Sequence, residues 1–380
     1  MAGVNIPFNK PHFTGKESSY ISDALERGHL SGNGFYTKQC QTFFENHYGF
    51  QKCLLTTSCT DALEMAAILC DFRPGDEIII PSFTFVSSVN AFILRGATPV
   101  FIDSRSDHPG IDEESIGQYI TDKTKAILVV HYAGVACDMD VIMSLAEKHG
   151  LWVVEDAAQA IDSTYKGKPL GGIGHLSCFS FHETKNISSG EGGLLVINDG
   201  NLVERAEIIW EKGTNRAAFW RGEVDKYTWV DIGSSFLPSE IIAAILFAQL
   251  KHLEEIQIER KRIWDYYHTN LHEIEEVGIL RPVMPQWATQ NGHLYYLICN
   301  TPEQQKTLLE ALKERGVGAV FHYVTLHDSP FARKRYQKVE LPNATRFSES
   351  LIRLPLYYDL SKREQDYIIS SLLEIVNTCS

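Results

Sequence analysis

The chain has 380 residues, of which 44% are hydrophobic, 22% charged and 11% aromatic, a composition typical of a globular protein with a sizeable core. Its net charge of −13, from 35 basic and 48 acidic residues, argues against extended nucleic acids and anionic membrane surfaces as partners. No apolar run approaches the ~20 residues of a membrane-spanning helix, and the first ten residues show no secretory signal, so we expect a cytoplasmic protein.

The cysteines are eight in number and are scattered along the chain without any C-x-x-C pair. In a long chain that lacks a signal peptide, free thiols are expected rather than a disulfide framework. Their spacing is not that of a zinc site. We therefore expect no disulfide and no metal.

Between residues 50 and 215, short apolar runs alternate with amphipathic stretches. The runs are rich in Val, Ile and Phe and are bounded by Gly, Pro or Asp, which predicts buried strands at 52–56, 77–81, 99–103, 126–131, 152–155, 177–181 and 194–197. The stretches between them predict helices at 60–70, 88–94, 113–120, 141–149 and 202–212. This alternation predicts an α/β fold with a mainly parallel, seven-stranded sheet and helices on both of its faces.

The pattern changes after a loop-like segment at 233–238. Pro238 is suited to the first turn of a helix, and a long helix is expected from there to about residue 273. Beyond it, the sequence predicts strands at 293–299 and 317–324 and helices at 303–315 and 363–376. We expect an N-terminal segment (1–20), a large domain (21–255) and a smaller C-terminal α/β domain (256–380), hinged by the long helix.

Ligands of an open α/β sheet bind outside the carboxyl ends of its strands, so the residues that follow each strand are the first candidates for a site. Ser58, Cys59 and Thr60 follow the first strand where a helix begins. Free N–H groups and hydroxyls at that place either cap the helix or hold a phosphate. The glycine-rich phosphate motifs are absent from the sequence.

Three more strand ends carry distinctive side chains. Asp156 follows a strongly apolar strand, where a carboxylate either caps the next helix or holds a cation such as a protonated ring nitrogen. Lys185 is either a solvated loop charge or an amine that burial makes nucleophilic. Phe85 either packs in the core or stacks on a planar cofactor. Together with the phosphate site, these residues meet the needs of pyridoxal 5′-phosphate.

The same segments resemble the DegT/DnrJ/EryC1 sugar aminotransferases, which have the type I aspartate aminotransferase fold. The matching segments run through nearly the whole chain: SCTDAL (58–63), PSFTFVSSVNA (81–91), HYAGVACDMD (131–140), VVEDAAQA (153–160), CFSFHETKN (178–186), GEGGLL (190–195), FHYVTLH (321–327) and RLPLYYDLS (353–361). The resemblance implies a large pyridoxal-phosphate domain, a smaller C-terminal domain and a homodimer whose subunits share active sites.

The resemblance also implies roles for single residues. Lys185 would be the Schiff-base lysine and move the proton, and Asp156 would pair with the pyridinium nitrogen. The remaining cofactor contacts would come from Ser58, Cys59, Thr60, Phe85, Gln159, Ser180 and Ser235. In many members an Asn at the position of Ser235 reaches the phosphate bound by the neighbouring subunit, and serine has a shorter side chain. The substrate pocket would include His182, His322, Tyr323 and His327, although His322 fits a core histidine equally well.

A closer resemblance concerns the substrate. The segments HYAGVACDMD, KGTNR (212–216) and DKYTWVDIGSS (225–235) are similar to those of members that convert dTDP-4-keto-6-deoxy-D-glucose to dTDP-4-amino-4,6-dideoxy-D-galactose for enterobacterial common antigen, with L-glutamate as amino donor. The alternatives are another 4-keto or 3-keto nucleotide sugar, a pyridoxal-phosphate-dependent sugar dehydratase, in which histidine replaces the lysine, and a non-catalytic binding protein on the same fold.

Overall fold

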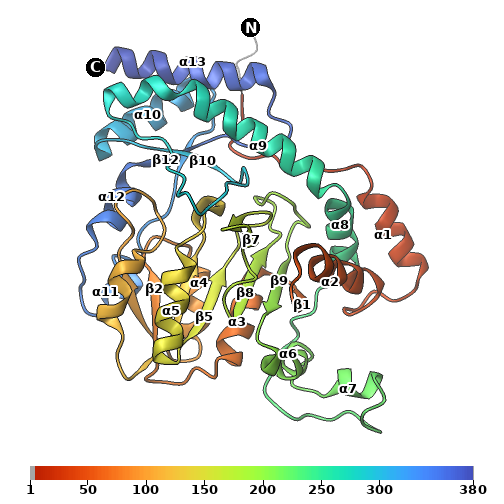
Figure 1. Cartoon of the computed structure of the whole chain (residues 1–380). Helices are drawn as coiled ribbons and strands as arrows, with labels where there is room; N and C mark the ends of the chain where they lie inside the picture. Colours follow the sequence, from red (N-terminus) through yellow and green to blue (C-terminus); the bar gives the residue numbers. More distant parts are fainter. Residues whose placement is uncertain (1–4, 380) are drawn as a thin grey trace.

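A seven-stranded sheet forms the centre of the computed structural model, which describes residues 5–379 (Figure 1). Residues 1–4 and 380, at the outer ends of the first and last predicted segments, lie outside it. The strands follow the predicted runs to within a few residues: β1 (Lys52–Thr56), β2 (Glu77–Pro81), β3 (Thr98–Ile102), β4 (Thr124–Val130), β5 (Trp152–Asp156), β8 (Leu176–Ser180) and β9 (Gly193–Ile197). The predicted α/β fold is confirmed.

The order of the strands is β1-β9-β8-β5-β4-β2-β3. All neighbours are parallel except β9, which runs antiparallel to both β1 and β8. One apolar core lies between the sheet and helices α3 (Cys59–Leu69), α4 (Val86–Ile93) and α6 (Val203–Trp210). The other lies against α2 (Phe35–Tyr48), α5 (Met139–His149) and α8 (Glu240–Lys251). Helices therefore cover both faces of the sheet, as the alternation of elements predicts.

A smaller α/β unit lies above the sheet in Figure 1. Its three antiparallel strands have the order β10-β12-β11, with β10 at Tyr295–Ile298, β11 at Val320–Phe321 and β12 at Leu351–Leu354. A third apolar core joins this sheet to α9 (Leu253–Asn270), α10 (Pro302–Glu314) and α13 (Lys362–Cys379). The central strand β12 was not predicted, because it is only four residues long and Pro355 follows it directly.

Three sequence predictions need correction. The long helix is two helices, α8 and α9, with His252 between them. Pro238, predicted in the first turn, lies before the helix, because Ser239 is the cap and accepts from the N–H of Ile242. Residues Glu113–Tyr119 form a 3-10 helix. The strand predicted at 317–324 has only two residues in the sheet. The domain boundary proposed at residue 255 falls inside α9 and stays a prediction.

The N-terminal part of the chain is more structured than its sequence pattern indicates. Helix α1 (Glu17–Glu26) and helix α2 precede the first strand. Before them, Ile6 forms a parallel bridge with Val317, so the segment around Ile6 lies beside the C-terminal unit. In the part of the chain that the structure describes, no helix is both long and apolar enough to cross a membrane. The seven cysteines whose side chains are described are free thiols.

Candidate active site

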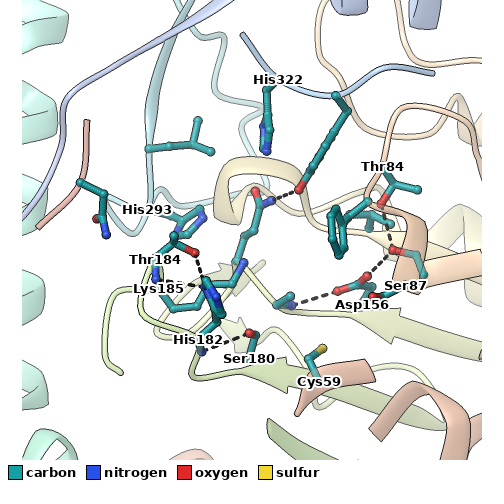
Figure 2. Close-up of a pocket in the computed structure, with 18 of the residues that line it drawn as sticks. Cys59, Thr84, Ser87, Asp156, Ser180, His182, Thr184, Lys185, His293 and His322 are labelled. Atoms are coloured by element: carbon teal, nitrogen blue, oxygen red, sulfur yellow. Dashed lines mark hydrogen bonds between the residues drawn. The ribbon is translucent and has the colours of Figure 1, made fainter. Parts of the chain in front are cut away.

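A cavity of about 600 Å³ lies at the carboxyl ends of the parallel strands, and the small unit supplies one of its walls. Most of the predicted site residues line it: Ser58, Cys59, Thr60, Phe85, Asp156, Gln159, Ser180, His182, Lys185, His322 and Tyr323. In Figure 2, Asp156 and Ser87 lie on one side of the cavity, Lys185 and His293 on the other. Side chains far apart in the sequence therefore meet in one place.

The start of α3 offers a cradle for an anion, made of Ser58, Cys59 and Thr60. Ser58 caps the helix, with its hydroxyl accepting from the N–H of Asp61 at 3.1 Å. The N–H groups of Cys59 and Thr60 belong to the first turn, where a helix provides no acceptor. The Thr60 hydroxyl donates to Ser87 at 2.9 Å and faces the cavity. The cap and the anion site, which the sequence left as alternatives, are thus compatible at this turn.

Gly193, at the start of β9, allows this cradle to pack closely on the sheet. A Cβ atom at this position would overlap the backbone of Ser58 and Cys59. The close approach at Gly193 is therefore between the backbones of β9 and the α3 cradle.

Asp156, the last residue of β5, is a buried carboxylate facing the cavity, with 6% of its surface exposed. Its Oδ2 accepts from the hydroxyl of Ser88 at 2.6 Å, and its Oδ1 accepts from the N–H of Ala158 at 3.1 Å. These two bonds fix the direction in which the carboxylate points. Among the described residues, no basic side chain forms an ion pair with Asp156, so the cavity holds an acceptor for a cationic ligand.

Lys185 lies in the turn after β8, where its N–H donates to the carbonyl oxygen of His182 at 2.9 Å. Burial lowers the pKa of its amine; Cys59 and Asp156 act in the opposite direction, and the positive charge of Arg353 adds to the lowering. A lower pKa leaves more of the amine unprotonated, which is the form that attacks a carbonyl carbon.

Gln159 links the sheet to the wall formed by the small unit. Its Oε1 accepts from the N–H of Ala133 at 2.6 Å, and its Nε2 donates to the hydroxyl of Tyr323 at 3.1 Å. The ring of Tyr323 stacks on His322 with 3.5 Å between centroids. Burial lowers the pKa of His322, so its ring is neutral, and its Nδ1 lies 2.9 Å from the hydroxyl of Tyr132.

His293, which the sequence placed only at the start of a strand, lines the cavity near Lys185. Its Nδ1 lies 2.8 Å from Oδ1 of Asn186, while Nδ2 of Asn186 donates to Gln257 and to the carbonyl oxygen of Asn291. Because Asn186 Oδ1 is an acceptor, His293 carries its proton on Nδ1 when neutral. Its Nε2 is then free to accept a hydrogen bond.

Two predicted residues do not line the cavity. His327 is buried behind it, where Nδ1 lies 2.6 Å from the hydroxyl of Ser82. Ser235 is exposed on the surface, and its backbone forms a bridge with Glu211. Two others lie at the rim: His182 is partly exposed beside Thr184, and Phe85 is 56% exposed.

Several residues of the cavity were missed in the sequence. Ser88 and Arg353 fall inside segments that carry the family resemblance, but neither was given a role. A charged side chain within the apolar run LIRLPL (351–356) is a signal that would have pointed to Arg353. Phe8 and Asn9 also line the cavity, and no local pattern indicates that the first residues fold back to this place.

Comparison with known proteins places these features in a family. The model of the DegT/DnrJ/EryC1/StrS aminotransferase family matches residues 11–373. The chain belongs to this family. The aminotransferase is 33% identical to the spore coat polysaccharide biosynthesis protein SpsC of Bacillus subtilis (strain 168), over 98% of this chain and 97% of the relative.

Solved structures agree with this assignment. The aminotransferase superposes on the putative sugar aminotransferase Spr1654 from Streptococcus pneumoniae, in its PMP form, with a TM-score of 0.91, 27% identity and coverage of 99% and 100% of the two chains. It also superposes on PseC of Helicobacter pylori, an aminotransferase involved in the biosynthesis of pseudoaminic acid, with a TM-score of 0.90, 25% identity and coverage of 99% and 100%. Its fold is therefore that of a sugar aminotransferase.

Proposed function

We propose that this sugar aminotransferase uses pyridoxal phosphate to convert dTDP-4-keto-6-deoxy-D-glucose to dTDP-4-amino-4,6-dideoxy-D-galactose, with L-glutamate as amino donor. The cofactor and the reaction type follow from the family. The observation that carries the proposal is that Lys185, Asp156 and the α3 cradle face one cavity. The substrate rests on the segments at 131–140, 212–216 and 225–235 and remains a proposal.

The residues of the cavity fit the cofactor. When bound, pyridoxal phosphate supplies the electron sink that allows an amine to leave one carbon and be added to another. Asp156 has no basic partner among the described residues and would hold the proton on the ring nitrogen. The cradle, with the Ser180 hydroxyl, would bind the phosphate. Phe85 would cover one face of the ring, and Gln159 would lie near the ring hydroxyl.

Lys185 performs the proton transfers in this mechanism. Its amine takes a proton from the amine-bearing carbon of the donor and later delivers one to C4 of the sugar, as a general base and then a general acid. The desolvation that lowers its pKa increases the unprotonated fraction of the amine, the form that takes the first proton. His182, His322 and Tyr323 would contact the substrate from the rim and the opposite wall.

The proposed enzyme is a homodimer with shared active sites. The segment around α7 (Arg216–Trp220) extends away from the sheet (Figure 1) and exposes Trp220, Tyr227, Trp229, Val230 and Ile232. We call these five residues the α7 patch. Monomers rarely leave a large contiguous apolar surface in water, and Ser235 lies close to the patch in sequence. We infer that the patch contacts the partner subunit; the role of Ser235 towards the partner's cofactor rests on the family resemblance.

A borohydride experiment tests the role of Lys185. The purified protein should be yellow, and reduction should attach the cofactor covalently to Lys185, as a mass spectrum of its peptides would show. Lys185→Ala should remove this attachment and transamination, whereas Lys123→Ala, at an exposed position outside the cavity, should alter neither. Turnover of the keto sugar by Lys185→Ala would contradict the mechanism.

The substrate proposal is tested by incubating the enzyme with glutamate and dTDP-4-keto-6-deoxyglucose and determining the product by NMR. We expect an amine at C4 in the axial, galacto configuration. An equatorial amine, or amination only of a 3-keto sugar, would assign the enzyme to another nucleotide sugar. Loss of water from the keto sugar without glutamate would instead indicate a dehydratase.

A further inference from the structure

Arg353 places a positive charge in the cavity without an opposite charge beside it. It stands in the central strand β12 and lines the cavity. Its Nη2 donates to the carbonyl oxygen of Phe321 at 3.1 Å, and its guanidinium carbon lies 4.6 Å from the centre of the Phe8 ring. Its Nε is shut off from solvent and has no hydrogen-bond partner. Across residues 5–379, no Asp or Glu forms an ion pair with it.

We expect the guanidinium of Arg353 to bind an anionic ligand. A guanidinium does not lose its proton in a protein, and partial burial without an opposite charge has a desolvation cost. Burial lowers the pKa of Arg353, opposed by the nearby Tyr132 and Tyr323. The groups that a planar guanidinium binds best, through two parallel N–H···O bonds, are carboxylates and phosphates.

The position of Arg353 indicates which of the anionic groups that enter the cavity it binds. Arg353 lines the same cavity as Lys185 and His322, and its positive charge contributes to lowering the pKa of both. An anion at Arg353 therefore lies near the carbon on which Lys185 acts. In an α-amino acid the carboxylate is bonded to that carbon, whereas in a nucleotide sugar the ring separates C4 from the diphosphate. The cofactor phosphate has its own site at the α3 cradle.

We propose that Arg353 binds the α-carboxylate of the amino donor and thereby selects an α-amino acid over other amines. This inference rests on the aminotransferase function proposed above. The hydrogen bond to Phe321 and the ring of Phe8 hold the guanidinium in place before the donor enters, so little side-chain freedom is lost on binding. The donor is then oriented with its amine-bearing carbon towards Lys185.

The test compares two donors in the first half-reaction alone, with no sugar present. Enzyme loaded with pyridoxal phosphate is mixed with L-glutamate or with 4-aminobutyrate, which is glutamate without its α-carboxylate, and the loss of yellow absorbance is followed. Arg353→Gln should lower kcat/KM for glutamate about 10- to 100-fold, the value of a charged hydrogen bond, and leave the rate with 4-aminobutyrate unchanged. Arg353→Lys should restore part of the loss. Arg363→Gln, at an exposed position in α13, is the control and should behave as wild type.

The second half-reaction separates this inference from the proposed function. Arg353→Gln loaded with pyridoxamine phosphate should aminate the keto sugar at the wild-type rate. Slowing of this step alone would assign Arg353 to the diphosphate, and equal losses with both donors would indicate a structural role; either result would overturn the inference. Wild-type enzyme that accepts an amine from glutamate but gives it to no keto sugar would overturn the proposed substrate and leave the Arg353 result standing.

Discussion

At the scale of single residues, the site depends on a few side chains whose neighbours fix their charge and direction. Asp156 is held by Ser88 and by the N–H of Ala158, so the carboxylate is oriented before any ligand binds. Such preorganised charge is commonly the largest single contribution to catalysis. The sequence could indicate Asp156, because a carboxylate after an apolar strand is unusual, but not Ser88, whose role depends on the contact across α4 and β5.

Asp156→Asn tests this account. The amide keeps the size of the side chain but cannot hold a proton on a ring nitrogen, so we expect kcat to fall about 10²- to 10³-fold, the usual effect of removing one preorganised group. Cofactor binding, measured by absorbance, should persist. Asp122→Asn, at an exposed site, is the control. An Asp156→Asn enzyme with wild-type kcat would show that the carboxylate does not act on the ring nitrogen.

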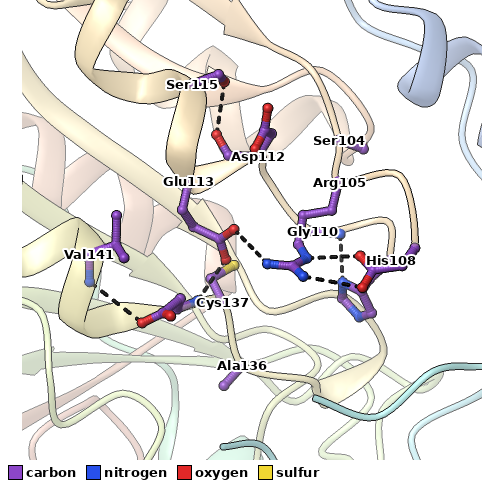
Figure 3. A network of polar contacts seen from close by, with 12 residues as sticks. Ser104, Arg105, His108, Gly110, Asp112, Glu113, Ser115, Ala136, Cys137 and Val141 are labelled. Atoms are coloured by element: carbon purple, nitrogen blue, oxygen red, sulfur yellow. Dashed lines mark hydrogen bonds and ion pairs between the residues drawn. The ribbon is translucent and has the colours of Figure 1, made fainter. Parts of the chain in front are cut away.

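At the scale of elements, buried strands were predicted well because their apolar runs are nearly continuous, whereas elements with mixed patterns were not. Helices α1 and α2 were not predicted, and the expected long helix is divided at His252. Networks of hydrogen bonds and ion pairs between elements also cannot be predicted from the local sequence pattern. Figure 3 shows one of them, in which Arg105 pairs with Glu113 and Glu113 accepts from the N–H of Asp138, the cap of α5.

His108 belongs to the same region and gives a prediction about pH. Its Nδ1 accepts from the N–H of Gly110 at 2.8 Å, and its Nε2 is buried without a partner. Burial lowers the pKa of His108 to about 4, with Arg105 and His131 acting in the same direction and Asp107 opposing. Between pH 6.5 and 4, the unfolded chain binds a proton that the folded chain excludes. The free energy of unfolding therefore falls as the pH falls through this range.

His108→Gln should remove this contribution. We expect the free energy of unfolding, measured in urea, to fall less in the variant than in wild type between pH 6.5 and 4. The two falls should differ by roughly 3 kcal/mol at most. The exposed His149→Gln serves as the comparison and should keep the wild-type slope. If His108→Gln kept that slope as well, the buried histidine would not be excluded from protonation in the folded protein.

At the scale of the whole molecule, the sequence predicted the layered fold but not how the parts close around the cavity. The strand ends that carry Asp156 and Lys185 could be placed at one edge from the parallel topology alone. The wall that carries Arg353 could not, because β12 is short and its partners β10 and β11 lie far from it in sequence. The proposed contact between subunits also cannot be predicted from the pattern of a single chain.

The α7 patch gives a prediction about assembly. We expect the wild-type enzyme to sediment as a dimer. Val230→Asp should weaken the dimer by two orders of magnitude or more, since a charge buried in an interface without a partner costs about 3–5 kcal/mol, and activity should fall with it. Ile258→Asp, at an exposed apolar position in α9 outside the patch, should leave both unchanged. If a monomer of the wild-type enzyme were fully active, the proposal that two subunits share each active site would be wrong.

The contact between Phe8 and Arg353 has a consequence for biosynthesis. All seven strands of the large sheet lie within residues 52–197, so the sheet can form while the ribosome is still translating the second half of the chain. The bridge of Ile6 can form only after Val317 has emerged, and the contact of the Phe8 ring only after Arg353 has. Ile6 and Phe8 therefore reach their final places only after the C-terminal unit has been translated, and the cavity gains the wall that carries Arg353 later than the sheet that forms its floor.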